Sequence, residues 1–149
     1  MRPRSKIALA WLWAVTWIAL VQVFASGSFS ASETARFIGP LLRWLLPGAD
    51  AELIATAHFA IRKTAHFIGY AILALLALRA FRLSFDRPLA WPAAASFALA
   101  LAVAAVDESR QAASADRTGA LSDVALDLTG AASALALASA FRRLGSARK

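Results

Sequence analysis

The sequence predicts an all-α membrane protein: a bundle of four transmembrane helices with one amphipathic segment at its outer surface. Hydrophobic residues make up 60% of the chain, and its mean hydropathy is +0.60. A soluble domain is nearer half apolar and interrupts its apolar runs with charges. Four apolar stretches approach the roughly 20 residues that a membrane-crossing helix needs. Because 149 residues fit one domain, we expect a single domain over residues 1–149.

Charge and cysteine content narrow the function classes. The chain has no cysteine, which excludes disulfides and thiolate metal sites. Its formal net charge of +7 would suggest a nucleic-acid partner in a soluble protein. In so apolar a chain we interpret the charge as a membrane orientation signal, and we expect no nucleic-acid partner.

The first predicted helix covers about residues 7–25. A basic start and a small-residue exit around Ala25–Gly27 also fit a signal peptide. However, the apolar run Ile7–Phe24 is longer than the roughly 7 to 15 residues of a signal-peptide core, and it contains three tryptophans. We therefore favour a membrane helix that is retained.

The second predicted element is an amphipathic helix over about residues 31–46. Ser30 and Glu33 have the spacing of a capping box. Six apolar residues follow at helical spacing on one side: Phe37, Ile38, Leu41, Leu42, Leu45 and Leu46. Pro40 is expected to bend or interrupt the helix. Two placements stay open, one in the membrane interface and one as a cap on the bundle.

Three further spans are expected at about residues 62–82, 89–108 and 120–141. Asp50 could cap a helix that runs through His58 into the second span. The third span is short, and Pro92 fits its first turn. The fourth contains Asp123 and Asp127, and its small residues suit close helix packing in lipid.

The basic residues predict the orientation. Ten of the 16 fall on the side of the two termini, against one acid, Asp86. These ten are Arg2, Arg4, Lys6, Arg79, Arg82, Arg87, Arg142, Arg143, Arg148 and Lys149. The positive-inside rule then places both termini in the cytoplasm. The first and third connections face outward.

Ionisable residues gather at the outward-facing helix ends. On a helix, Lys63, His66 and Tyr70 share one face, and Arg62 lies on the adjacent stripe. Asp127 lies inside an apolar stretch, at a cost of about 2.5–3.5 kcal/mol unless it finds a partner. Other polar residues at the outward ends of the third and fourth spans include Asp107, Glu108, Arg110, Gln111, Arg117 and Asp123. Of these, Asp107 and Arg110 are expected to be exposed and structural.

The residue types suggest a binding or catalytic site for the headgroup of an anionic lipid or of a polyprenyl phosphate. Cations at headgroup level suit a phosphate, and a histidine can move a proton near neutral pH. The candidate catalytic residues are His66, Glu108 and Asp123, and the candidate substrate-binding residues are Arg62, Lys63, Tyr70, Gln111, Arg117 and Asp127. The cations oppose a divalent ion, so no metal and no cofactor are expected. Whether the chain is an enzyme stays open.

Two other functions compete with this interpretation. The charge cluster could be structural, in a non-catalytic protein of the cell envelope. Transport of a small solute, with Asp127 as a proton relay, is disfavoured because four short helices lack an inverted repeat.

Three motifs carry a resemblance to a known family. They are Arg62-Lys-Thr-Ala-His-Phe-Ile-Gly-Tyr70, Asp107-Glu-Ser-Arg-Gln111 and Arg117-Thr-Gly-Ala-Leu-Ser-Asp-Val124. In order and spacing they resemble the Lys/Arg-x-x-His-Phe-x-x-Tyr, Asp-Glu-x-x-Gln and Arg-x-Gly-x-x-x-Asp-Val motifs of the VanZ-like family. The chain departs from the family pattern at Gly69, where a glutamate is frequent, and at residues 112–116, which lack the usual aromatic and proline residues.

The resemblance implies a small multi-pass protein of the bacterial plasma membrane. It also implies a link to the cell envelope, while the residue types above suggest membrane lipids or lipid-linked envelope intermediates as partners. The family's namesake is associated with low-level resistance to the antibiotic teicoplanin, a role that we do not transfer to this chain.

Overall fold

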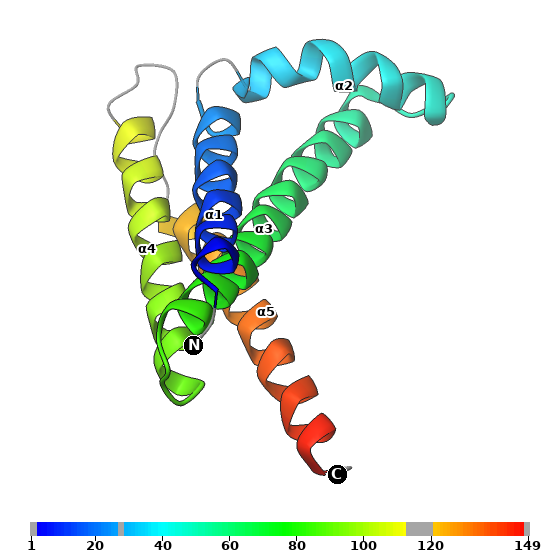
Figure 1. The fold of residues 1–149 in the computed structure, drawn as a ribbon. Helices are drawn as coiled ribbons and strands as arrows, with labels where there is room; N and C mark the ends of the chain where they lie inside the picture. Colours follow the sequence, from blue (N-terminus) through cyan, green and yellow to red (C-terminus); the bar gives the residue numbers. More distant parts are fainter. Residues whose placement is uncertain (1–2, 27–28, 113–120, 148–149) are drawn as a thin grey trace.

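The structure, a computed structural model, describes residues 3–26, 29–112 and 121–147. In these residues it contains five helices and no strand. The helices are α1 (Arg4–Phe24), α2 (Ala31–Leu45), α3 (Ala51–Ser84), α4 (Ala90–Ala112) and α5 (Leu121–Ala147). All except α2 are long and apolar enough to cross a membrane. The predicted all-α membrane bundle is therefore confirmed (Figure 1).

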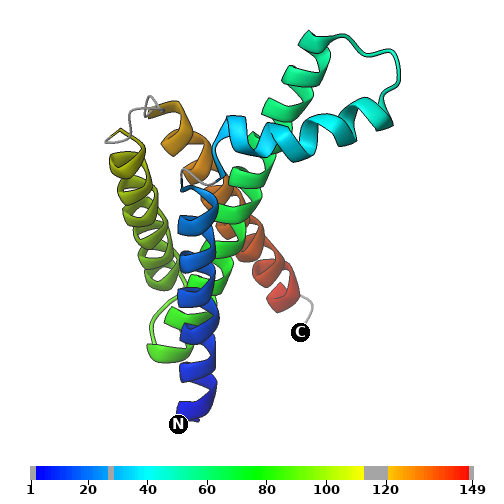
Figure 2. The ribbon, with the colours of Figure 1, turned by 90° about the horizontal axis from the view of Figure 1, so that it is seen from above.

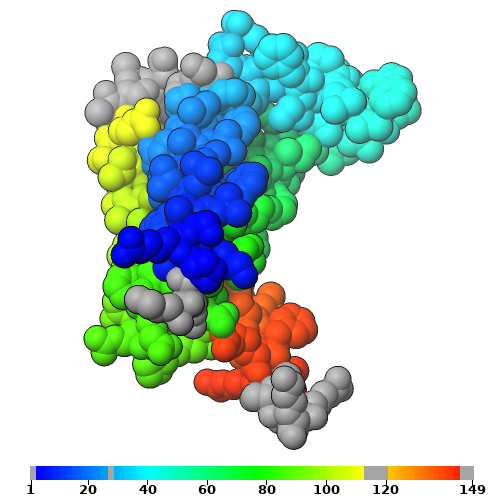
Figure 3. Space-filling model, viewed as in Figure 1, coloured from blue at the N-terminus to red at the C-terminus, as the bar shows by residue number. Residues whose placement is uncertain are grey.

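The four long helices alternate in direction along the chain. As a result, the N-terminus of α1 and the C-terminus of α5 lie at one end of the bundle (Figures 1 and 2). At the opposite end, which we call the distal end, α1 ends at Phe24, α4 ends at Ala112 and α5 begins at Leu121. The helix α2 lies across the distal end, and in the space-filling view it projects beyond the bundle (Figure 3).

The helix α3 is longer than the membrane requires. Its 34 residues span about 51 Å at 1.5 Å per residue, whereas the hydrocarbon core is roughly 30 Å thick. The carboxylate of Asp50 accepts a hydrogen bond from the Leu53 backbone N–H at 2.7 Å, which confirms the predicted cap. The helix thus begins 11 residues before the predicted span at residue 62. The extra turns carry His58 into the contact with α2.

The helices α4 and α5 continue past their predicted ends at residues 108 and 141. The prediction was based on where the apolar sequence stops. A helix can continue beyond the membrane because its backbone hydrogen bonds are internal.

The helix α2 has two sides with different surroundings. Ser30 caps it by accepting from the Glu33 N–H at 3.3 Å, as its spacing predicted. The helix passes through Pro40 without interruption. Leu42 is buried and α2 packs on α3. The apolar side chains that remain exposed are Phe37, Leu41, Trp44 and Leu45. This spacing forms one stripe, so α2 packs on α3 with one side and exposes an apolar stripe on the other.

The core is built from one stripe of each of three helices. Its buried members are Tyr70, Leu73, Ala74 and Leu78 of α3, Ala100, Val103 and Ala104 of α4, and Ala131 and Leu135 of α5. The pair α3 and α5 packs most extensively. At Gly130 the two backbones come so close that a Cβ would overlap with the Phe67 carbonyl group. A small residue at this position therefore sets the distance between the two helices.

The helix α1 lies on the outside of this three-helix core and packs along α3. Its buried residues are alanines, Ala10 and Ala14. The indole N–H of Trp17 donates to the Gly69 carbonyl at 2.9 Å, and that of Trp11 donates to the Ser84 hydroxyl at 2.9 Å. Two indoles and two alanines thus hold α1 against α3.

Candidate functional site

The three core stripes continue into ionisable residues at the distal end. On α3 the stripe passes from Leu73 to Tyr70, His66 and Lys63. On α4 it passes from Ala104 to Asp107, and on α5 from Ala131 to Asp127 and Asp123. Residues three and four apart lie on the same helix face. The polar residues therefore face the bundle axis rather than the surrounding membrane.

Two pairs join α3 to α5 in this cluster. The ammonium of Lys63 forms an ion pair with the Asp123 carboxylate. One turn deeper, His66 Nδ1 lies 3.4 Å from Asp127 Oδ1. The outer pair is about one-third exposed, whereas the Asp127 side chain is only 6% exposed. The two pairs, Lys63–Asp123 and His66–Asp127, thus form a ladder in which the inner pair is less exposed to solvent than the outer pair.

Below the ladder lie Tyr70 and Asp107. The Tyr70 side chain is fully buried, within electrostatic range of the Asp107 and Asp127 carboxylates. Its hydroxyl has no hydrogen-bond partner among the described residues. Buried polar groups are nearly always hydrogen-bonded, so this hydroxyl marks a polar interior that the described side chains do not fully satisfy.

The predicted exposure of Asp107 is wrong, because the residue is only 3% exposed. The reason lies in its position one turn beyond Val103 and Ala104 on the buried stripe of α4. Arg110 points to the other side and is exposed as predicted. It donates to the Gln22 side-chain oxygen at 2.6 Å, which links α4 to α1.

Arg62 faces away from the ladder, toward α2. Its guanidinium donates to the Phe29 carbonyl at 2.8 Å and to the Thr34 hydroxyl at 3.0 Å. The same hydroxyl lies 3.1 Å from His58 Nε2. Consecutive helix residues point about 100° apart, so Arg62 and Lys63 leave α3 on the two flanks of His66 rather than on one stripe. His58 is buried in this contact.

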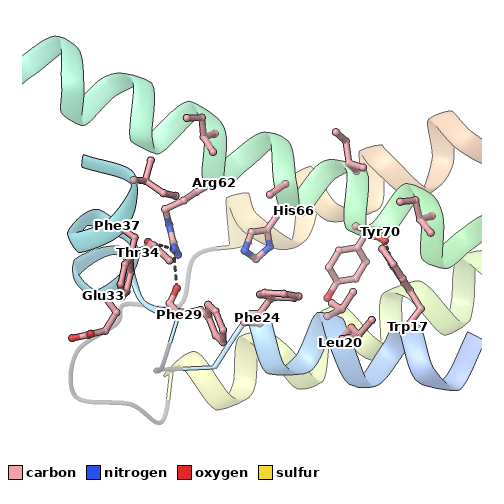
Figure 4. A pocket seen from close by; sticks show the side chains of 18 residues that line it. Trp17, Leu20, Phe24, Phe29, Glu33, Thr34, Phe37, Arg62, His66 and Tyr70 are labelled. Atoms are coloured by element: carbon pink, nitrogen blue, oxygen red, sulfur yellow. Dashed lines mark hydrogen bonds between the residues drawn. The ribbon is translucent and has the colours of Figure 1, made fainter. Parts of the chain in front are cut away.

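A cavity of about 650 Å³ separates α1 from α3 beneath α2. Its walls are mainly apolar, and Arg62, Thr34 and Glu33 line it on the side of α2. Figure 4 shows His66 projecting from α3 into this space toward Phe24. His66 therefore contacts both the cavity and the Asp127 carboxylate. It is the residue that connects the two parts of the distal end.

Two other predicted site residues make no polar contact with the described part of the site. Glu108 and Gln111 are half-buried, and neither makes a hydrogen bond or ion pair with another described residue. Arg117 lies outside the described residues. Within the described ranges, no three His, Asp or Glu side chains are placed to hold a metal ion together.

Sequence reasoning missed Thr34, Trp17 and the Phe29 carbonyl, all of which touch the cavity. Thr34 resembles any threonine in a first helical turn, so no local signal marks its role. The burial of Asp107 had a signal, since Ala100, Val103 and Asp107 have the spacing of one helix face.

The comparisons with known proteins give one match. No curated protein and no solved structure is detectably similar to the chain. The sequence model of the family described as VanZ/LLP1 matches residues 7–142, a range that contains all four long helices except a few terminal residues. The chain is therefore a member of the VanZ/LLP1 family of membrane proteins.

Proposed function

We propose that this protein binds the anionic headgroup of a membrane lipid at its distal end and that the His66–Asp127 pair exchanges a proton with that headgroup. One observation carries the proposal. The imidazole lines a cavity that is large enough for a ligand, while its Nδ1 lies 3.4 Å from a buried carboxylate.

The pairing gives His66 a defined chemical role. A carboxylate beside one ring nitrogen fixes the orientation and tautomer of an imidazole, and it stabilises the imidazolium when a proton arrives. With Nδ1 directed at Asp127, the Nε2 atom is the one that can exchange a proton with a ligand. Asp127 is then a positioning residue, and His66 is the group that touches the ligand.

Two cations give the site its preference for anions. Arg62 is held by the Phe29 carbonyl and the Thr34 hydroxyl, so its guanidinium is already in place before a ligand arrives. Lys63 lies one residue further on the other side of His66. A guanidinium and an ammonium flanking an imidazole suit a phosphate group. To bind the ligand, Lys63 must break its ion pair with Asp123, which limits the affinity that this lysine adds.

The charge distribution supports an outward-facing site. Within the described residues, the end that carries the termini holds Arg4, Lys6, Arg79, Arg82, Arg87, Arg142 and Arg143. The positive-inside rule assigns that end to the cytoplasm of a bacterium. On this basis the distal end meets the outer leaflet of the plasma membrane, where it would meet lipids or lipid-linked envelope intermediates.

A structural role is the second candidate. Both ladder pairs, Lys63–Asp123 and His66–Asp127, join the same two helices. In that case the cluster fixes the register of α3 against α5 and binds nothing.

Native mass spectrometry of the detergent-purified protein separates the two. The protein is mixed with phosphatidylglycerol or phosphatidylcholine, and retained lipid is counted for wild type, Arg62→Gln and Lys63→Gln. The matched control is Arg36→Gln, because Arg36 is an exposed cation that pairs only locally with Glu33. We expect selective retention of phosphatidylglycerol that both site variants weaken and the control preserves. Equal retention of both lipids by all four proteins would leave only the structural role.

A further inference from the structure

We propose that the cavity between α1, α2 and α3 holds one hydrocarbon chain of a membrane lipid, which enters sideways between α1 and α3 with its head beside Arg62. The identity of the head rests on the proposed function above. The position of the chain rests on the cavity itself.

The walls have the composition of a chain-binding site. Six apolar side chains from α1, α2 and α3 illustrate it: Leu20, Val21, Phe37, Ile38, Ile68 and Ile72. The volume of about 650 Å³ falls within the roughly 300–1,000 Å³ of typical ligand sites. Polar side chains line the cavity near α2 and at His66 and Tyr70.

The rim of the cavity carries exposed apolar side chains. Leu20 and Phe24 of α1 and Ile61 and Ile68 of α3 line the cavity and are also large, exposed apolar residues. In helices that cross a membrane, such residues contact lipid chains. The cavity therefore opens toward hydrocarbon, and a lipid chain is the occupant that reaches it without crossing water.

The part of the cavity deeper along α3 has mainly apolar walls; Tyr70 also lines it, and its hydroxyl, which has no hydrogen-bond partner among the described residues, is fully buried. Trp17 lines it, but its indole N–H is already bonded to the Gly69 carbonyl at 2.9 Å. Gly69 itself contributes no side chain, and a Cβ there would meet only Val21 at an ordinary contact distance of 3.9 Å. This region is thus mainly apolar and roomy, which suits a flexible methylene chain better than a polar solute.

The opposite side of the cavity matches a charged head. The Arg62 guanidinium lies there with the Thr34 hydroxyl, held by the start of α2. Glu33 also lines the cavity, but its carboxylate pairs with Arg36 at 3.3 Å and points away from Arg62 (Figure 4). An apolar chamber with a fixed cation at one side is complementary to an anionic lipid rather than to an uncharged hydrophobic molecule.

Photocrosslinking tests this directly. The full-length protein in nanodiscs receives phosphatidylglycerol with a diazirine on one acyl chain, and crosslinked residues are mapped by peptide mass spectrometry. We expect crosslinks concentrated on the cavity residues of α1 and α3, and we expect them to saturate as labelled lipid is added. Crosslinks spread evenly over the lipid-facing sides of all four spans, with no saturation, would overturn the proposal.

Cavity-filling variants sharpen the test. Ala65 lines the cavity and is exposed, so Ala65→Trp should fill the space without disturbing the core. Gly69→Leu fills it from a second position. Ala102→Trp on the exposed side of α4 is the matched control. We expect severalfold fewer cavity crosslinks in both filled variants and none lost in the control. Unchanged crosslinking in both folded variants would contradict the proposal.

Repeating the mapping with phosphatidylcholine carrying the same labelled chain separates this inference from the proposed function. If both lipids label the cavity equally, the chain site stands and the anionic headgroup site falls. If the protein retains phosphatidylglycerol through Arg62 but the cavity is never labelled, the headgroup site stands and the chain site falls.

Discussion

The imidazole of His66 lies 3.4 Å from the Asp127 carboxylate and at the same time lines the cavity beneath α2. The partner comes from a different helix, and it is almost fully buried. A histidine used only for packing would need neither the buried carboxylate nor access to a cavity. This double contact distinguishes His66 from His58, which is buried in contact with Thr34.

Replacement of His66 by glutamine should weaken anionic-lipid binding. The imidazole lines the cavity, its Nδ1 lies 3.4 Å from the Asp127 carboxylate, and its other ring nitrogen can donate a hydrogen bond to a phosphate. We expect the glutamine variant to bind phosphatidylglycerol roughly three- to tenfold more weakly, a loss of about 0.6–1.4 kcal/mol. Native mass spectrometry measures the retained lipid.

Arg36→Gln is again the control, because Arg36 is exposed and pairs locally with Glu33; it should bind phosphatidylglycerol as wild type does. A His66→Gln protein that binds the lipid as tightly as wild type would show that His66 does not contact the headgroup.

The Lys63–Asp123 pair should contribute little to stability. Its two side chains are about one-third exposed, and ion pairs of this kind are typically worth about 0.2–1 kcal/mol. A double-mutant cycle with Lys63→Gln and Asp123→Asn, read as unfolding free energy in detergent, should give a coupling energy in that range. A coupling several times larger would favour the structural candidate, because then the pair would be needed to hold α3 on α5.

The sequence was sufficient for the elements and for the face that the polar residues share. Apolar length located the four spans, the spacing of Ser30 and Glu33 located α2, and Asp50 located the start of α3. The register of Lys63, His66 and Tyr70 followed from helical periodicity alone. Each of these properties depends on residues close together in the chain.

The division of the polar residues between two sites could not be predicted in the same way. Arg62 bonds to Phe29 and Thr34 only because α2 folds back over α3. The cavity lies where α1, α2 and α3 meet, and nothing local in any one of these helices specifies it. Helix tilt and loop path, which decide both features, are set by tertiary packing.

Gly130 should be intolerant of any side chain. A Cβ at this position overlaps with the Phe67 backbone carbonyl, which cannot rotate away as a side chain can. We expect Gly130→Ala to destabilise the protein by about 1–3 kcal/mol, the usual cost of overpacking. Gly39→Ala is the matched control, because a Cβ there meets nothing within 4 Å; it should be neutral or stabilising by about 0.5–1 kcal/mol. Equal unfolding free energies for the two variants would mean that α3 and α5 are not in close contact at Gly130.

The exposed stripe of α2 should lie in the membrane interface with its apolar side down. Phe37 is 79% exposed and Trp44 is 76% exposed, although the transfer of such large apolar side chains out of water is favourable. The chain lacks cysteine, so single spin labels can be placed at Phe37→Cys and, on the charged side, at Arg36→Cys. In nanodiscs the label at residue 37 should be more accessible to oxygen than to a water-soluble nickel complex, and the label at residue 36 should show the reverse. Equal accessibility at both positions would place α2 in water above the bundle, and the cavity beneath it would then open to solvent rather than to lipid.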